Sequence, residues 1–288
     1  MGYSARYHAT SLIAVFLALA VGILVGAEFG GDVVTNTRKD LEHSLTGNLQ
    51  DARDRADQIG GELDRSNEFA ERVFPVLVRN QLAGKRIGIV ALGGLPGDDS
   101  SAIETALGPT GARLVAVGVV REPVDMHSLA GDLSATRLAG IGRNTDTQTA
   151  FGVGTGRQLV KGGDLLNRVR SQLFSRASGN FRNLDGIIVV RNQPEDMGPV
   201  QRATAGRLES ALMSGITATR TPTVGVETTT TEPSSVGFFQ SNDLSSVDDV
   251  DMVAGRVAAV FALVGAEGSF GVKSSADRLL PDLLAPGR

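Results

Sequence analysis

The chain has 288 residues, a formal net charge of −4, three histidines, five methionines, and neither cysteine nor tryptophan. The lack of cysteine excludes disulfides, thiolate metal sites and thiol nucleophiles, and the acidic balance gives no basic footprint for nucleic acid. The length allows a globular domain of roughly 200 residues beside a shorter N-terminal region.

The segment from Ala9 to Ala27 contains no ionisable residue. As a helix it would span roughly 28 Å, close to the ~30 Å hydrocarbon core of a bilayer. Its composition predicts a single transmembrane anchor within residues 1–30, and Gly22 and Gly26 would let two such helices approach closely. A cleaved export signal and a buried helix are the alternatives. In the anchor and the export-signal interpretations, the chain after residue 28 lies outside the cytoplasm, in the cell envelope.

Residues 31–83 are predicted to form a helical stalk, because apolar side chains recur there at heptad spacing. The a positions are Leu49, Ala56, Leu63, Ala70 and Leu77, and the d positions are Leu45, Ala52, Ile59, Ser66 and Val73. A coiled coil would make the protein a homo-oligomer, whereas the alternative is a lone amphipathic helix folded back on the globular domain. Gly60-Gly61 weakens the coil by roughly 1 kcal/mol per glycine, and Pro75 predicts an end or a kink.

Residues 84–288 alternate between predicted strands and helices. Strands are expected at 85–92, 113–120, 184–191, 222–227 and, as a short fifth strand, 236–240. Helices are expected at 101–107, opened by a Ser101–Glu104 capping box, and at 124–138, 158–174, 199–213 and 253–264, with a glycine-rich loop at 140–156. Near-continuous apolar strands separated by helices predict a mostly parallel sheet covered on both faces, a three-layer α/β domain.

The glycine-rich segments do not match nucleotide-binding motifs. Gly93-Gly94-Leu95-Pro96-Gly97 follows the first strand but departs from the dinucleotide pattern, and Gly152-Val153-Gly154-Thr155-Gly156 follows no predicted strand. No G-x-S-x-G elbow occurs, and His8 and His43 lie in the N-terminal region, which leaves His127 alone in the globular domain. We therefore expect no enzyme, and no catalytic or cofactor-binding residue is assigned.

Two acidic features remain as candidates for binding. The run Asp248-Asp249-Val250-Asp251 offers oxygen ligands for a hard cation, but it precedes a predicted helix, where carboxylates cap free N–H groups. Capping is the interpretation we favour. Glu227 ends the fourth predicted strand, at the edge where α/β folds bind ligands.

Three stretches resemble a known family: residues 7–30, 224–263 and 268–281. The most specific marks are Glu227, Pro233-Ser234-Ser235, the run from Ser246 to Asp251, and Gly255-Arg256. In these residues the chain resembles the actinobacterial copper-transport protein family (MctB-like). The resemblance implies an N-terminal membrane segment, a coiled coil and an α/β region.

Copper enters only through this resemblance, which implies copper handling at the cell envelope, pore formation in the outer membrane and export of excess copper. Copper(I) prefers thiolate, thioether and imidazole ligands, and Met126-His127 is the one adjacent pair of such residues. The metal ligands therefore stay unassigned. The first hypothesis is an envelope protein of copper transport and homeostasis, and the alternative is a non-enzymatic scaffold or binding module on a coiled-coil stalk, with the bilayer and an envelope protein as partners.

Overall fold

The computed structural model describes the backbone of residues 5–282 and the side chains of residues 7–28 and 44–282. The chain divides into two compact units, Met1–Ser66 and Asn67–Arg288. The boundaries expected after residues 30 and 83 stay predictions.

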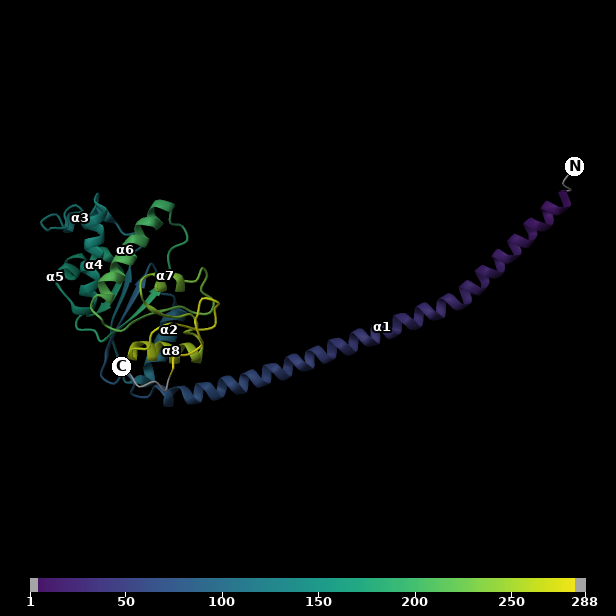
Figure 1. Cartoon of the computed structure of the whole chain (residues 1–288), viewed down its shortest axis with the longest axis horizontal. Coiled ribbons are helices and arrows are strands. Elements are labelled where there is room, and N and C mark those ends of the chain that lie inside the picture. Colours follow the sequence, from purple (N-terminus) through teal and green to yellow (C-terminus); the bar gives the residue numbers. More distant parts are fainter. Residues whose placement is uncertain (1–4, 283–288) are drawn as a thin grey trace. The chain divides into compact units, whose positions relative to one another are not determined.

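The first helix, α1, runs from Ala5 to Val78 and includes Pro75 (Figure 1). An end at Pro75 was therefore the wrong expectation, although proline removes one intrahelical hydrogen bond. Within the second unit the last turns of α1 are held by packing, because Phe74 and Val78 are buried in a hydrophobic cluster with α2 (Gly97–Leu107) and α8 (Val253–Val264). Burial of these side chains outweighs the missing hydrogen bond.

The second unit is built on a seven-stranded sheet in the order β3-β2-β1-β4-β5-β6-β7. The strands are β1 (Arg86–Leu92), β2 (Arg113–Val120), β3 (Phe174–Gly179), β4 (Gly186–Arg191), β5 (Thr223–Val226), β6 (Ser245–Val247) and β7 (Ser269–Phe270). All neighbouring pairs are parallel except β2 and β3, which are antiparallel. The predicted mostly parallel sheet is confirmed.

Helices cover both faces of this sheet, because successive strand residues point to opposite sides. In β1, Ile87 and Ile89 join the cluster that includes α2 and α8. Val90 and Leu92 instead join a second cluster on the other face. That cluster includes residues of α3 (Met126–Asp132), α4 (Thr145–Lys161), α5 (Asp164–Leu173), α6 (Pro199–Thr217) and α7 (Val236–Ser241).

Several predicted elements differ from those observed. Residues 236–240 belong to helix α7, not to a fifth strand, and α2 begins at Gly97, with Ser101 inside it and not as a capping-box residue. Helix α3 ends at Asp132, short of the predicted 138. Strands β3, β6 and β7 were not predicted, because β3 is an exposed edge strand and β6 and β7 have only three and two residues.

The largest error was the loop predicted at 140–156, which is mostly helix α4. Its glycines allow close packing against α6, since a Cβ on Gly156 would lie 2.1 Å from the carbonyl oxygen of Leu212. Gly215 of α6 makes the reciprocal contact, with its Cβ position 2.2 Å from the carbonyl oxygen of Val153. The predicted helix at 158–174 is interrupted at Gly162-Gly163, where α4 ends and α5 begins.

Candidate functional site

A buried polar network lies at the carboxyl ends of β5 and β6. Its centre is Glu227, which is 2% exposed and accepts hydrogen bonds from Ser234 Oγ at 2.7 Å and from the backbone N–H of Ser235 at 2.6 Å. Lys273 Nζ completes the shell at 2.7 Å from Glu227 Oε1 and also donates to the carbonyl oxygen of Thr231 at 2.8 Å. The network thereby fixes the loop after β5 against the C-terminal segment.

The acidic run after β6 has a different role from the predicted one. Asp248, fully buried, accepts hydrogen bonds from the backbone N–H groups of Val272 at 2.8 Å and Lys273 at 3.2 Å. Asp251 accepts them from the N–H and hydroxyl groups of Thr229 at 2.8 and 2.7 Å. Capping of α8 was therefore the wrong expectation, because Met252 occupies the cap position and no side chain in the described part of the chain caps the helix there. The tertiary fold offers these carboxylates N–H groups from distant loops instead.

Asp249 is the member of this run that has no partner among the described residues. It is completely buried, and both its carboxylate oxygens lack a hydrogen bond within the described part of the chain. Burial, together with the charges of Asp248 and Asp251, raises the pKa of Asp249 to about 7. The carboxyl group is thus held in a place that favours its neutral form.

Gly255-Arg256 fastens the same region to the end of α1. A Cβ on Gly255 would lie 2.0 Å from the carbonyl oxygen of Asp249, so the start of α8 can approach only with glycine there. The Arg256 side chain is buried, forms an ion pair with Glu71 and stacks 5.2 Å from the ring centroid of Phe74. Several residues that marked the family resemblance, among them Glu227, Asp248 and Arg256, are therefore buried around the carboxyl ends of β5 and β6 and the start of α8.

Beside this region a crevice of about 240 Å³ opens at the carboxyl edge of the sheet. It is lined by residues of α2, of the end of β4 and of the loop after β5, namely Pro96, Asp98, Asp99, Arg191, Asn192 and Glu227, among others. After β1 the chain continues to β2 on one side of the sheet, and after β4 it continues to β5 on the other side. The strand order therefore reverses between β1 and β4, beside the crevice. Ligands bind at such points in open α/β sheets, and the predicted position of Glu227 at this edge is confirmed.

A second group of buried charges lies near the end of β4. Arg191 donates to both carboxylate oxygens of Glu209 at 3.1 Å, and Gln193 Nε2 donates to the same carboxylate at 3.0 Å. The pKa of Glu122 is raised to about 9, mainly by burial and next by the negative charge of Glu209. The positive charge of Arg191 lowers it by a smaller amount. Glu122 therefore carries a proton in the folded protein at neutral pH.

Because Glu122 is protonated in the folded protein, we expect the folded unit to lose stability as the pH rises from about 4.5 to about 9. In the unfolded chain Glu122 has an ordinary pKa of about 4.5 and loses its proton near that pH, whereas the folded chain holds the proton to about pH 9. The stabilisation is complete below the lower value and lost through that window. Glu122→Gln, which stays neutral, should be more stable than the parent at about pH 8 by several kcal/mol. Calorimetry of the full chain in detergent across this range measures the difference.

The matched control is Glu104→Gln, because Glu104 is an exposed carboxylate on α2. It should leave the slope of stability against pH unchanged. A parent and a Glu122→Gln variant with parallel profiles would contradict the assignment of the proton to Glu122.

The sequence candidates for copper do not come together. His127 is exposed at the start of α3, where its backbone N–H is capped by Asp125 at 2.9 Å, and Met126 packs against the core. His43 lies outside the residues whose side chains the structure describes. Within the described residues no group of three or more His, Cys, Asp or Glu side chains is arranged to hold a metal ion.

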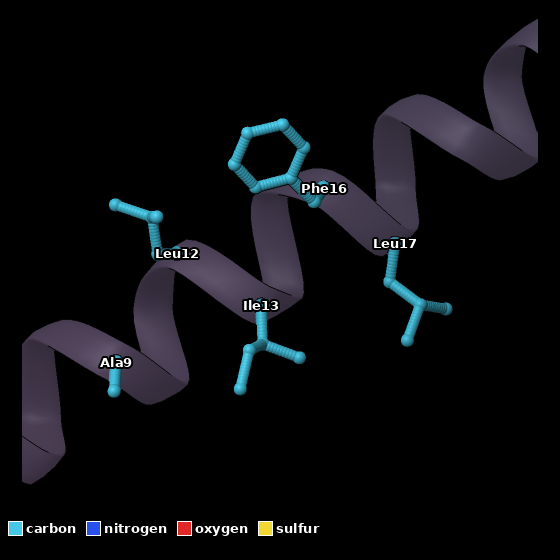
Figure 2. A pocket seen from close by; sticks show the side chains of 5 residues that line it. All are labelled: Ala9, Leu12, Ile13, Phe16 and Leu17. Atoms are coloured by element: carbon cyan, nitrogen blue, oxygen red, sulfur yellow. The ribbon is translucent and has the colours of Figure 1, made fainter.

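The N-terminal helix carries the predicted membrane segment. Tyr7–Glu28 is long and apolar enough to cross a bilayer. Figure 2 shows Leu12, Ile13, Phe16 and Leu17 projecting outward from α1, and each is 62–63% exposed. Large apolar side chains without protein contacts are expected where lipid covers them.

Asp99, Glu122, Glu209 and Lys273 were missed by the sequence analysis. A usable signal existed for Asp99, since it follows the turn after the first strand, where a parallel sheet places its binding edge. Glu122 and Glu209 are 87 positions apart in number and carry no motif, and only the packing of α6 on the sheet brings Glu209 beside Arg191.

Comparison with known proteins gives one consistent result. The family described as "Copper transport outer membrane protein, MctB" matches residues 3–281. Proteins named "Copper transporter MctB" from Mycobacterium bovis and from two strains of Mycobacterium tuberculosis are each 24% identical over 291 residues. The alignments cover 90% of this chain and 91% of each relative.

Proposed function

Because the chain belongs to the MctB family of copper transport outer membrane proteins, we propose that it is a membrane-anchored envelope protein that maintains copper homeostasis. The observation that carries this proposal is the family match along residues 3–281, which includes the apolar helix as well as the α/β unit. Copper is the transported substrate in this account. The anchor keeps the rest of the chain at the membrane, with residues after 28 outside the cytoplasm.

The test is the copper tolerance of a deletion strain. We expect the strain to become copper-sensitive and the full chain to restore tolerance. A form in which residues 1–28 are replaced by a cleavable secretion signal should reach the envelope but fail to restore it. This form separates anchoring from export. Unchanged tolerance of the deletion strain would contradict the copper role, and full rescue by the secreted form would contradict the need for an anchor.

The stalk supports a homo-oligomeric form of the protein. Leu49 and Leu63, both a positions of the heptad, are 58% exposed in the single chain. The d-position residues Leu45 and Ile59 are 53% and 65% exposed. Such a stripe is covered when the helices of two or more copies associate. Oligomerisation would also bring several anchors together, which a pore made from these helices requires.

Single cysteines test this association cleanly, because the natural chain has none. Leu49→Cys, at an a position, should form a disulfide-linked dimer under mild oxidation in membranes, since facing a residues come within disulfide reach in a parallel coil. Asp54→Cys, at the outward f position, is the matched control and should stay monomeric. Equal cross-linking of both variants, or of neither, would argue against the coiled coil; gel electrophoresis without reductant gives the result.

A further inference from the structure

The crevice at the reversal point of the sheet contains carboxylate groups that the protein itself does not neutralise. Of its charged lining, Glu227 is paired with Lys273, and Arg191 is paired with Glu209. Asp98, Asp99 and Glu232 take part in none of the ion pairs found among the described residues. The crevice therefore carries excess negative charge.

Asp99 is the decisive residue. It is 5% exposed, lines the crevice, and its Oδ1 is buried without a hydrogen-bond partner within the described part of the chain. A buried carboxylate oxygen that lacks a donor costs free energy that a bound donor would recover. Burial and the charges of Asp251, Asp98 and Glu227 also raise the pKa of Asp99 to about 6, so an ionised Asp99 would gain from a neighbouring cation.

The remaining lining defines the chemistry of the ligand. The threonine residues Thr228, Thr230 and Thr231 and the amide of Asn192 add neutral polar groups around these carboxylates. The described carboxylates are not grouped in threes at metal-holding positions, which disfavours a bare metal ion. An ammonium group suits the lining better, because its N–H donors can bond separate carboxylate and hydroxyl oxygens.

We propose that this crevice binds the protonated amino group of a small organic molecule, with Asp99 as its principal acceptor and Asp98 and Glu232 supplying further negative charge. The volume of about 240 Å³ accommodates an ammonium group with a short alkyl chain. Such binding gives the α/β unit a ligand of its own, beyond the copper role proposed above.

Equilibrium dialysis of the full chain in detergent against radiolabelled 1,4-diaminobutane tests the proposal. We expect saturable binding to one site per chain. Asp99→Asn should weaken it by about tenfold or more, the loss typical of a charge-assisted hydrogen bond. Binding by the parent should weaken as the pH falls from about 7.5 to about 5, because Asp99 takes up its proton, and Asp99→Asn should lose most of this dependence.

Asp146→Asn is the matched control, because Asp146 is exposed on α4 and lies outside the crevice. It should bind like the parent. Asp99→Asn should remain folded by calorimetry, since it removes a buried charge whose Oδ1 has no donor among the described residues. The proposal would be overturned if no saturable binding were found at diamine concentrations up to about 10 mM, since the binding free energy would then be weaker than ~3 kcal/mol. Equal affinity of Asp99→Asn and the parent, or displacement of the diamine by equimolar Mg²⁺, Ca²⁺ or Cu²⁺, would overturn it as well.

Discussion

Lys273→Met is expected to cost about 3–5 kcal/mol of folding free energy, the loss typical of removing one partner from a buried ion pair. The Glu227 side chain is almost fully buried and would be left with only Ser234 and the Ser235 N–H as donors. Lys273 also ties the carbonyl oxygen of Thr231 to the C-terminal segment, and this bond would be lost too. Calorimetry of the full chain in detergent measures the loss.

A second variant separates the charge effect from simple truncation. In Lys273→Met/Glu227→Gln, the buried charge is gone with its partner, so much of the lost stability should return. Lys85→Met removes an exposed lysine beside β1 and should change stability by less than about 0.5 kcal/mol. If Lys273→Met were as stable as Lys85→Met, the Glu227–Lys273 pair would not hold the loop after β5 in place.

Gly156→Ala is expected to cost about 2–3 kcal/mol, although alanine is the better helix former. The added methyl group would lie 2.1 Å from the carbonyl oxygen of Leu212 and 3.0 Å from the Cα of Gly215. Both contacts are with backbone, so no side-chain rotation can relieve them, and α4 and α6 must move apart. The gain of roughly 1 kcal/mol in helix propensity is too small to compensate.

Gly154→Ala is a matched control in the same helix. Its Cβ would meet only the end of the Leu165 side chain, at 3.2 Å, and that side chain can turn away. This variant should equal or exceed the parent in stability, and hydrogen exchange of the amides in α4 and α6 should distinguish the two substitutions. Faster exchange in both variants, or in neither, would contradict the close packing of these helices.

The sequence predicted the structure best where a pattern depends only on residues that are close together in the chain. The uncharged run that includes Leu12 and Phe16 predicted a helix long and apolar enough to cross a bilayer, because the hydrocarbon core sets both length and composition. The continuous apolar strands β1 and β4 predicted a parallel sheet, since both their faces must be covered.

The sequence patterns gave wrong predictions at glycine-rich segments and missed very short strands. Gly152 and Gly156 indicate a loop by propensity, yet in α4 they allow close approach to α6, a contact that depends on residues far along the chain. Strands β6 and β7 have too few residues for a period to appear, and their pairing depends on β5.

For the sites, the sequence by itself determined which chemistry is available: no thiols, few imidazoles, many carboxylates. It also determined that Glu227 ends a strand at a binding edge. Only the tertiary structure decided which carboxylates are neutralised. Lys273 reaches Glu227 across 46 positions of sequence, whereas Asp99 Oδ1 and both carboxylate oxygens of Asp249 are buried without a donor among the described residues. The physical reason is that composition and period are local properties, whereas desolvation and ion pairing depend on which distant groups the fold brings within a few ångströms.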